Sequence, residues 1–225
     1  MKKLFSIISL LLLCVLLVGV CGCKNQTDNL MNYVSELKCE LYEGASENYT
    51  LKASYGFKEV DYQNDAKVGK VQHLLTFRLE DKTLEETTYV LSFEHDGKSY
   101  EGRFELSPTA NALVLTLNVE YFDQKSFTVQ VGTLEHKEQF CLNSILPQNT
   151  MSAEKALQSL YKTQKEMVDG FYDEQGNFNA EIYLRVMVKN EKAYWYIGFA
   201  SGNKKLKALL IDGVNGEVLA IREVF

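Results

Sequence analysis

The chain has 225 residues, of which 24 are Lys or Arg and 30 are Asp or Glu, so its formal net charge is −6. An acidic chain lacks the clustered positive charge that binds nucleic acid or grips anionic lipid, so we expect neither activity. Hydrophobic residues make up 46% of the chain and there are only two prolines, which predicts a folded protein with one good core or two modest ones.

The first two dozen residues have the layout of an export signal, because two lysines precede an almost unbroken apolar run at residues 4–20. The run ends in Val20-Cys21-Gly22-Cys23, which resembles the lipobox of bacterial lipoprotein signal peptides. The resemblance implies cleavage between Gly22 and Cys23 and attachment of a diacylglycerol to Cys23, with Cys21 the weaker candidate because the bulkier Val20 precedes it. Two acyl chains anchor a protein firmly.

This signal implies a protein held at the extracytoplasmic face of the cell membrane, with residues 1–22 removed and residues 23–32 forming a polar, lipidated tether. The removed segment carries two lysines and no acid, so the mature chain has a net charge of −8. The alternative is an uncleaved membrane-spanning helix, although the run of about 17 apolar residues is shorter than the roughly 20 that a span needs.

Strand signals follow the tether one after another. Period-two alternation, which indicates one buried face and one wet face, predicts strands at residues 37–41, 51–57, 71–79, 89–93, 100–106, 113–119 and 127–131. Asp96-Gly97 is a strong hairpin signal between the fourth and fifth of them. Residues 33–142 are therefore predicted to form an antiparallel β-sandwich of immunoglobulin-like type, with a small barrel as the alternative.

The pattern becomes helical after residues 143–150. Ser152 suits a helix N-cap, Glu154 places an acid in the first turn, and apolar residues recur at helical spacing up to about Asp169. Further strands are predicted at residues 182–188, 193–200 and 206–212, and a last short strand runs through Val224.

Three stretches of residues 143–225 share the pattern of a known domain family. They are Ser152-Ala153-Glu154-Lys155-Ala156-Leu157, Tyr194-Trp195-Tyr196-Ile197, and Leu210 to Val218, in which Asp212 ends one strand and Asn215-Gly216-Glu217-Val218 opens the next. On these stretches the segment resembles the PepSY family of small helix-plus-sheet domains, with a cystatin-like sheet as the nearby alternative. The resemblance implies an α+β fold of a kind found in protease propeptides and bacterial envelope proteins.

The sequence contains no recognised catalytic motif and no set of metal-binding residues at the usual spacing. His73, His95 and His136 are the only histidines, and none has a partner at a recognised metal-ligand spacing. His73 alternates in phase with buried positions and is expected to be partly buried, whereas His95 beside the hairpin turn is expected in solvent. The chain carries no phosphate-binding glycine loop or nucleophile signature. We therefore expect no enzyme, no metal and no cofactor.

Two cysteines remain in the mature chain besides the anchor. A bridge between Cys39 and Cys141 would close a long loop and could stabilise the fold by about 4 to 5 kcal/mol in the chain-entropy model. Cys39 is, however, in phase with Leu37 and Leu41, where a free thiol behaves as a small apolar residue. The sequence favours free thiols and leaves the disulfide as the alternative.

The C-terminal sheet is apolar on both faces, and one helix can cover only one of them. The second face is predicted to carry Tyr183, Met187, Tyr194, Tyr196, Leu209 and Ile211. Such a face either packs on the sandwich or binds a partner, because large exposed apolar patches usually mark interaction sites. These six residues are the candidate interaction face.

Together these patterns predict a non-catalytic, membrane-anchored lipoprotein that acts as a binding module for an unknown envelope protein. One alternative is a modulator or inhibitor of an extracytoplasmic protease, which the PepSY resemblance alone implies by analogy. The other is a carrier of a small ligand or a metal ion.

Overall fold

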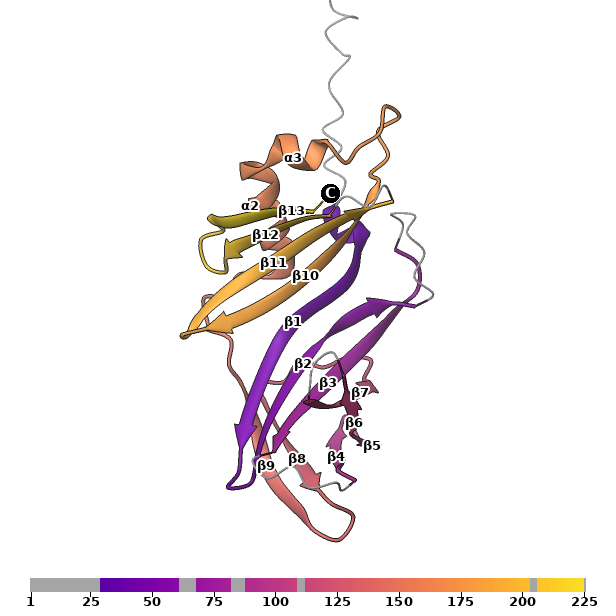
Figure 1. The fold of residues 1–225 in the computed structure, drawn as a ribbon, viewed down its shortest axis with the longest axis vertical. Helices are drawn as coiled ribbons and strands as arrows, with labels where there is room; N and C mark the ends of the chain where they lie inside the picture. Colours follow the sequence, from indigo (N-terminus) through magenta and orange to yellow (C-terminus); the bar gives the residue numbers. More distant parts are fainter. Residues whose placement is uncertain (1–28, 61–67, 82–87, 109–111, 203–205, 225) are drawn as a thin grey trace, which may run out of the picture.

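The computed structural model describes residues 29–60, 68–81, 88–108, 112–202 and 206–224. The predicted signal peptide, the cleavage site after Gly22 and the lipidation site Cys23 lie outside these ranges. Within them, no helix is long and apolar enough to cross a membrane. The described chain is mainly β, with the helices gathered at one end of an elongated molecule (Figure 1).

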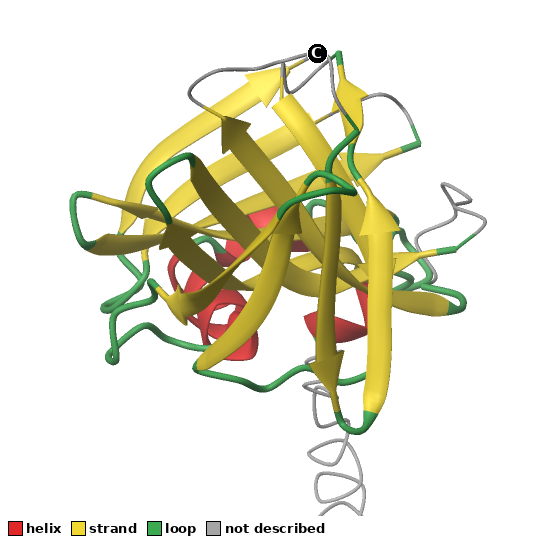
Figure 2. Cartoon of the chain, turned by 90° about the horizontal axis from the view of Figure 1, so that it is seen from below, coloured by secondary structure: helices red, strands yellow, loops and turns green. Residues whose placement is uncertain are grey.

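Nine strands of the described chain form a strongly curved, barrel-like antiparallel sheet. They are β1 (Val34–Ala45), β2 (Tyr49–Glu59), β3 (Val71–Asp81), β4 (Val90–His95), β5 (Lys98–Arg103), β6 (Glu105–Ser107), β7 (Ala112–Asn118), β8 (Ser126–Gly132) and β9 (Lys137–Ser144). Their order is β5-β4-β8-β9-β1-β2-β3-β7-β6. Figure 2 shows the strands curling around a common interior. This arrangement is closer to the barrel alternative, and it contains one strand, β9, that the alternation did not predict.

The C-terminal part packs two short helices on a four-stranded antiparallel sheet. Its elements are the 3₁₀ helix η1 (Leu30–Tyr33) from the N-terminal end, then α2 (Ala153–Thr163), α3 (Lys165–Asp169), β10 (Ala180–Lys189), β11 (Lys192–Ser201), β12 (Leu206–Asp212) and β13 (Val218–Val224). The predicted N-cap is confirmed, since Ser152 Oγ accepts a hydrogen bond from the amide of Lys155 at 3.3 Å. The single predicted helix is divided at Gln164.

Strand β1 belongs to both parts of the molecule. Its first half pairs in parallel with β10, placing Leu37 beside Leu184, and its second half pairs antiparallel with β9 near Tyr42. Along almost its whole length β1 also pairs antiparallel with β2, with a bulge between Lys38 and Glu40. The hydrogen-bonded sheet is therefore continuous from β13 to the barrel.

Two separate cores lie on the inner face of this sheet. In the barrel the core is aromatic, with Tyr42, Phe77, Phe93, Phe122 and Phe127 in edge-on or tilted contact at centroid distances such as 4.7 Å between Phe122 and Phe127. Beneath α2, the second core contains Leu157 and Leu160 of the helix packed with Ile182, Trp195 and Ile197 of the sheet. We call the opposite face of the sheet the outer face, and on β10, β11 and β12 it contributes no residue to either core.

Candidate interaction site

The three histidines are structural or exposed. His73 is half-buried, as predicted, and its Nδ1 lies 3.2 Å from the hydroxyl of Tyr55. The prediction for His95 is wrong, because this residue is only 9% exposed, with Nε2 2.6 Å from the carbonyl of Tyr121 and the ring against Phe122. His136 is exposed. Among the described residues, no three His, Cys, Asp or Glu side chains come together as a metal site would require.

The two cysteines of the described chain are free thiols. The register that pairs Tyr42 with Ser144, continued by three residues, places Cys141 opposite Ala45. Ala45 is six positions from Cys39, or about 20 Å along a strand, whereas a disulfide needs Cα atoms within about 7 Å of each other. The disulfide alternative is therefore not realised in this fold.

Different reactivities are expected for these two thiols. Burial, assisted by the charge of Glu40, raises the pKa of the Cys39 thiol to about 12, whereas Cys141 is exposed. The thiolate is the reactive form. A chain that begins at Lys24 should therefore take up one equivalent of iodoacetamide at pH 8 when folded, and a second only in denaturant, as counted by mass spectrometry. Cys141→Ser should reduce the folded value to zero, and rapid double labelling of the folded chain would contradict the burial of Cys39.

The candidate interaction face is partly as predicted. Register pairs place Met187 beside Tyr194 and Tyr196 beside Leu210 on the outer face, and Tyr183 lies on the same side of β10. Leu209 and Ile211 do not belong there. They are 1% and 0% exposed in the core beneath α2, opposite Ile197 and Trp195. In β12 every residue from Ala208 to Ile211 is apolar, so alternation could not assign the phase, and Ala208 and Leu210 take the places predicted for Leu209 and Ile211.

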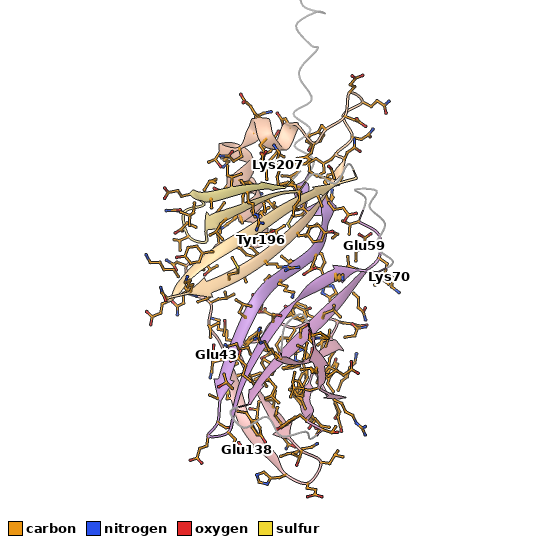
Figure 3. The ribbon with its side chains drawn as sticks, in the orientation of Figure 1. Glu43, Glu59, Lys70, Glu138, Tyr196 and Lys207 are labelled. Carbon is orange, nitrogen blue, oxygen red and sulfur yellow. The ribbon has the colours of Figure 1, made fainter. Side chains whose placement is uncertain are left out.

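The candidate side chains on the outer face of the C-terminal sheet belong to neither core. Tyr183, Tyr194 and Tyr196 are half-buried and Met187 is 40% exposed, yet none of them is part of either core. Figure 3 labels Tyr196 in this region, close to where the C-terminal strands approach β1.

One end of this face holds a shallow apolar hollow. It has a volume of about 290 Å³ and lies over β11, β12 and β13, lined by Tyr196, Leu206, Ala208, Leu209, Leu210, Ala220 and Arg222. Most of these side chains are aliphatic, so the apolar hollow can bury a small hydrophobic group.

A second hollow adjoins the first on the same face. This cationic hollow has a volume of about 280 Å³ and is lined by Glu36, Leu37, Lys38, Ser54, Gly56, Phe57, Lys58, Leu74, Thr76, Thr116 and Arg185, from β1, β2, β3, β7 and β10. Arg185 of this hollow is the direct register partner of Tyr196, which lines the apolar hollow. The two hollows therefore meet at this pair.

Positive charge exceeds negative charge in the cationic hollow. Glu36 is the one carboxylate among its described lining residues, and it lies 3.0 Å from Arg185 Nη2 and 4.0 Å from Lys38 Nζ. Lys58 is the register partner of Glu36 across β1 and β2. Burial lowers the pKa of Lys38, Glu36 opposes this effect, and the charges of Arg185 and Lys58 lower the pKa further. The hollow thus holds three cations and one carboxylate in a chain of net negative charge.

No family model, curated protein or solved structure matches the chain.

The cationic hollow was not among the predicted sites. Its three cations come from β1, β2 and β10, and β10 is distant in sequence from the other two strands. In the sequence, each cation occupies a position that alternation assigns to the solvent-facing side of its strand. A lysine at such a position is typical of any solvated face. Only the pairing of the three strands brings the charges together.

Proposed function

We propose that this protein is a non-catalytic, lipid-anchored, extracytoplasmic binding protein whose outer face receives a partner in the cell envelope. The observation that carries the proposal is the pair of adjoining hollows, one apolar and one cationic, on a sheet face that neither core uses. The membrane anchor at Cys23 rests on the lipobox resemblance.

The position of Asn29, the first described residue, bears on how an anchor at Cys23 would orient the protein at the membrane. Asn29 lies six residues after Cys23, so the intervening chain can span at most about 22 Å. Asn29 and η1 lie against α2. Helix α2 lies at the end of the molecule opposite the β8–β9 hairpin (Figure 1). An anchor at Cys23 would hold the helical end near the bilayer, with the barrel extending away from it.

We also propose that the C-terminal part is PepSY-like and that the preceding strands form an immunoglobulin-like sandwich. In favour of a PepSY-like part, a Ser-capped helix covers one face of an antiparallel sheet, and Asp212 accepts hydrogen bonds from the amides of Val214 and Asn215. Modulation of a protease follows from that likeness alone. In favour of a sandwich, strands β1, β2, β3 and β7 share the barrel core with β4, β8 and β9.

Crosslinking on intact cells tests the proposed binding function. The double variant Tyr194→Ala/Tyr196→Ala should reduce the yield of crosslinked partner at least tenfold, because it removes Tyr196, which lines the apolar hollow beside Arg185, and Tyr194, the next residue on the same face of β11. Immunoblots should show unchanged abundance in the membrane fraction. The matched control is Tyr121→Ala, which removes a tyrosine that is 67% exposed on the barrel. An unchanged yield with the double variant would count against the outer face.

A second candidate function, carriage of a small apolar ligand, is favoured by a separate hollow. This hollow has a volume of about 550 Å³ and lies between η1 and α2, where Leu30, Leu157, Tyr161 and Tyr172 supply apolar lining. Native mass spectrometry of the full chain, purified without denaturant, should then show a bound species of constant added mass. Spectra of the ligand-free chain alone would contradict carriage.

A further inference from the structure

A single row of residues runs across the outer face and connects the two hollows. Successive register pairs join Leu210 to Tyr196, Tyr196 to Arg185, Arg185 to Lys38 and Lys38 to Gly56. Directly paired residues in neighbouring strands lie on the same side of a sheet, and neighbouring strands are about 4.8 Å apart. The distance from Leu210 in the apolar hollow to Lys38 in the cationic hollow is therefore about 14 Å.

Hydrogen-bond donors dominate the floor of the cationic hollow. Thr76 and Thr116 are directly opposed, with their hydroxyl oxygens 3.2 Å apart, and Ser54 adds a third hydroxyl. Gly56, the register partner of Lys38, also lines this hollow. Cations and hydroxyls of this kind bind oxyanions such as carboxylate or phosphate.

One cation in this hollow is not engaged by a carboxylate. Arg185 and Lys38 both contact Glu36, whereas Lys58 makes no ion pair within the described part of the chain. A carboxylate from a ligand, placed among Lys38, Lys58 and Arg185, would have three charged donors. The existing Glu36 limits the site to a small anionic group, because further negative charge would meet its like charge.

We propose that this row binds an extended peptide segment of a partner protein, with an apolar side chain in the apolar hollow and an Asp or Glu carboxylate among Lys38, Lys58 and Arg185. An extended chain advances about 3.3 to 3.6 Å per residue, so about 14 Å corresponds to four residues. The segment would therefore carry an acid four positions from an aliphatic or aromatic residue. This inference rests on the proposed binding function and specifies the chemistry of the partner.

Selection from a random nonapeptide phage library on the immobilised full chain, held in detergent, tests the inference. Enriched peptides should carry an acid four positions from an apolar residue. The affinity of an enriched peptide should fall at least tenfold when its acid is changed to the amide, and at least tenfold with Lys38→Met/Lys58→Met. It should also fall with increasing salt, because partly exposed charge pairs are screened. Enrichment without acids would overturn the proposal.

A charge-matched control separates a local effect from a change in net charge. Lys98→Met/Lys137→Met removes two exposed lysines from β5 and β9 of the barrel, and peptide affinity should stay within twofold. Inorganic phosphate serves as the second probe. If phosphate binds at the cationic hollow while no peptide requires an apolar residue, the hollow is a simple anion site and the peptide assignment is wrong.

The two proposals fail in different ways. If Tyr194→Ala/Tyr196→Ala abolishes crosslinking on cells but Lys38→Met/Lys58→Met leaves crosslinking and peptide binding unchanged, the outer face is a binding surface for a partner that is not acidic. If neither double variant affects crosslinking, the outer face is not the binding surface and both proposals are contradicted. Thermal melting of both variants controls for folding.

Discussion

Replacement of Trp195 by alanine is expected to lower the free energy of unfolding by about 3 to 5 kcal/mol. Trp195 is 1% exposed and is among the largest fully buried side chains, packed beneath α2. Its Nε1 donates a hydrogen bond to the carbonyl of Met151 at 3.0 Å, at the start of the segment that leads into the helix. Truncation removes this bond and leaves a cavity between helix and sheet. Urea denaturation followed by circular dichroism measures the loss.

Its sequence neighbours on the outer face provide the control. Tyr194→Ala and Tyr196→Ala should each cost no more than about 1 kcal/mol, because these half-buried side chains are in neither core. Trp195→Phe keeps most of the packing and should lie between these values and Trp195→Ala. Equal losses at positions 194, 195 and 196 would contradict the assignment of the two faces.

Replacement of Gly56 by alanine is expected to cost about 3 kcal/mol or more. A Cβ at this position would lie 2.7 Å from the carbonyl carbon of Leu37 and 2.9 Å from Cα of Lys38, and it would be closer still to the carbonyl oxygen of Leu37. These are backbone atoms, so no side-chain rotation relieves the contact. Leu37 is also held between two strands by its pairing with Phe57 and Leu184.

A substitution at a neighbouring position of β2 serves as the control for Gly56→Ala. It changes another lining residue of the cationic hollow without creating a backbone clash. Ser54→Ala changes the adjacent outer-face position of the same strand, where a Cβ is already present, and should change stability by no more than about 0.5 kcal/mol. Chemical denaturation of both variants gives the comparison. Wild-type stability of Gly56→Ala would mean that β1 and β2 do not approach each other as closely as described.

Both substitutions affect the connection between the barrel and the C-terminal sheet. Trp195 holds the helix on the strands that follow β10, and Gly56 allows the bulged part of β1 to approach β2. Because β1 pairs with both parts, the outer face runs from one to the other without a break. The proposed peptide site depends on that continuity, since its apolar end lies on β11 to β13 and its charged end on β1 and β2.

Features with local causes could be predicted from the sequence alone. Period-two alternation predicted seven strands, which cover every described barrel strand except β9, with β5 and β6 predicted as one strand. A half-buried strand repeats every two residues wherever its partner lies. Ser152 and Glu154 marked the helix start by chemistry confined to one turn. The alternating faces of β10 and β11 were assigned correctly for the same reason, and the sparse, unpaired cysteines were favoured as free thiols.

Features that depend on distant partners were missed or left open. The phase of β12 was wrong because consecutive apolar residues carry no alternation, and its pairing with β11 decides which of them are buried. His95 was expected in solvent, but Tyr121 and Phe122, some 26 residues later, cover it.

The cationic hollow shows the same limit most clearly. Lys38 and Arg185 are register partners only because β1 pairs in parallel with β10, almost 150 residues further along the chain. No local pattern encodes that pairing, since each strand satisfies its own alternation whichever neighbour it takes. Local sequence patterns were enough to predict most of the strands and the start of the helix. Only the tertiary structure placed three cations and an apolar hollow in one row.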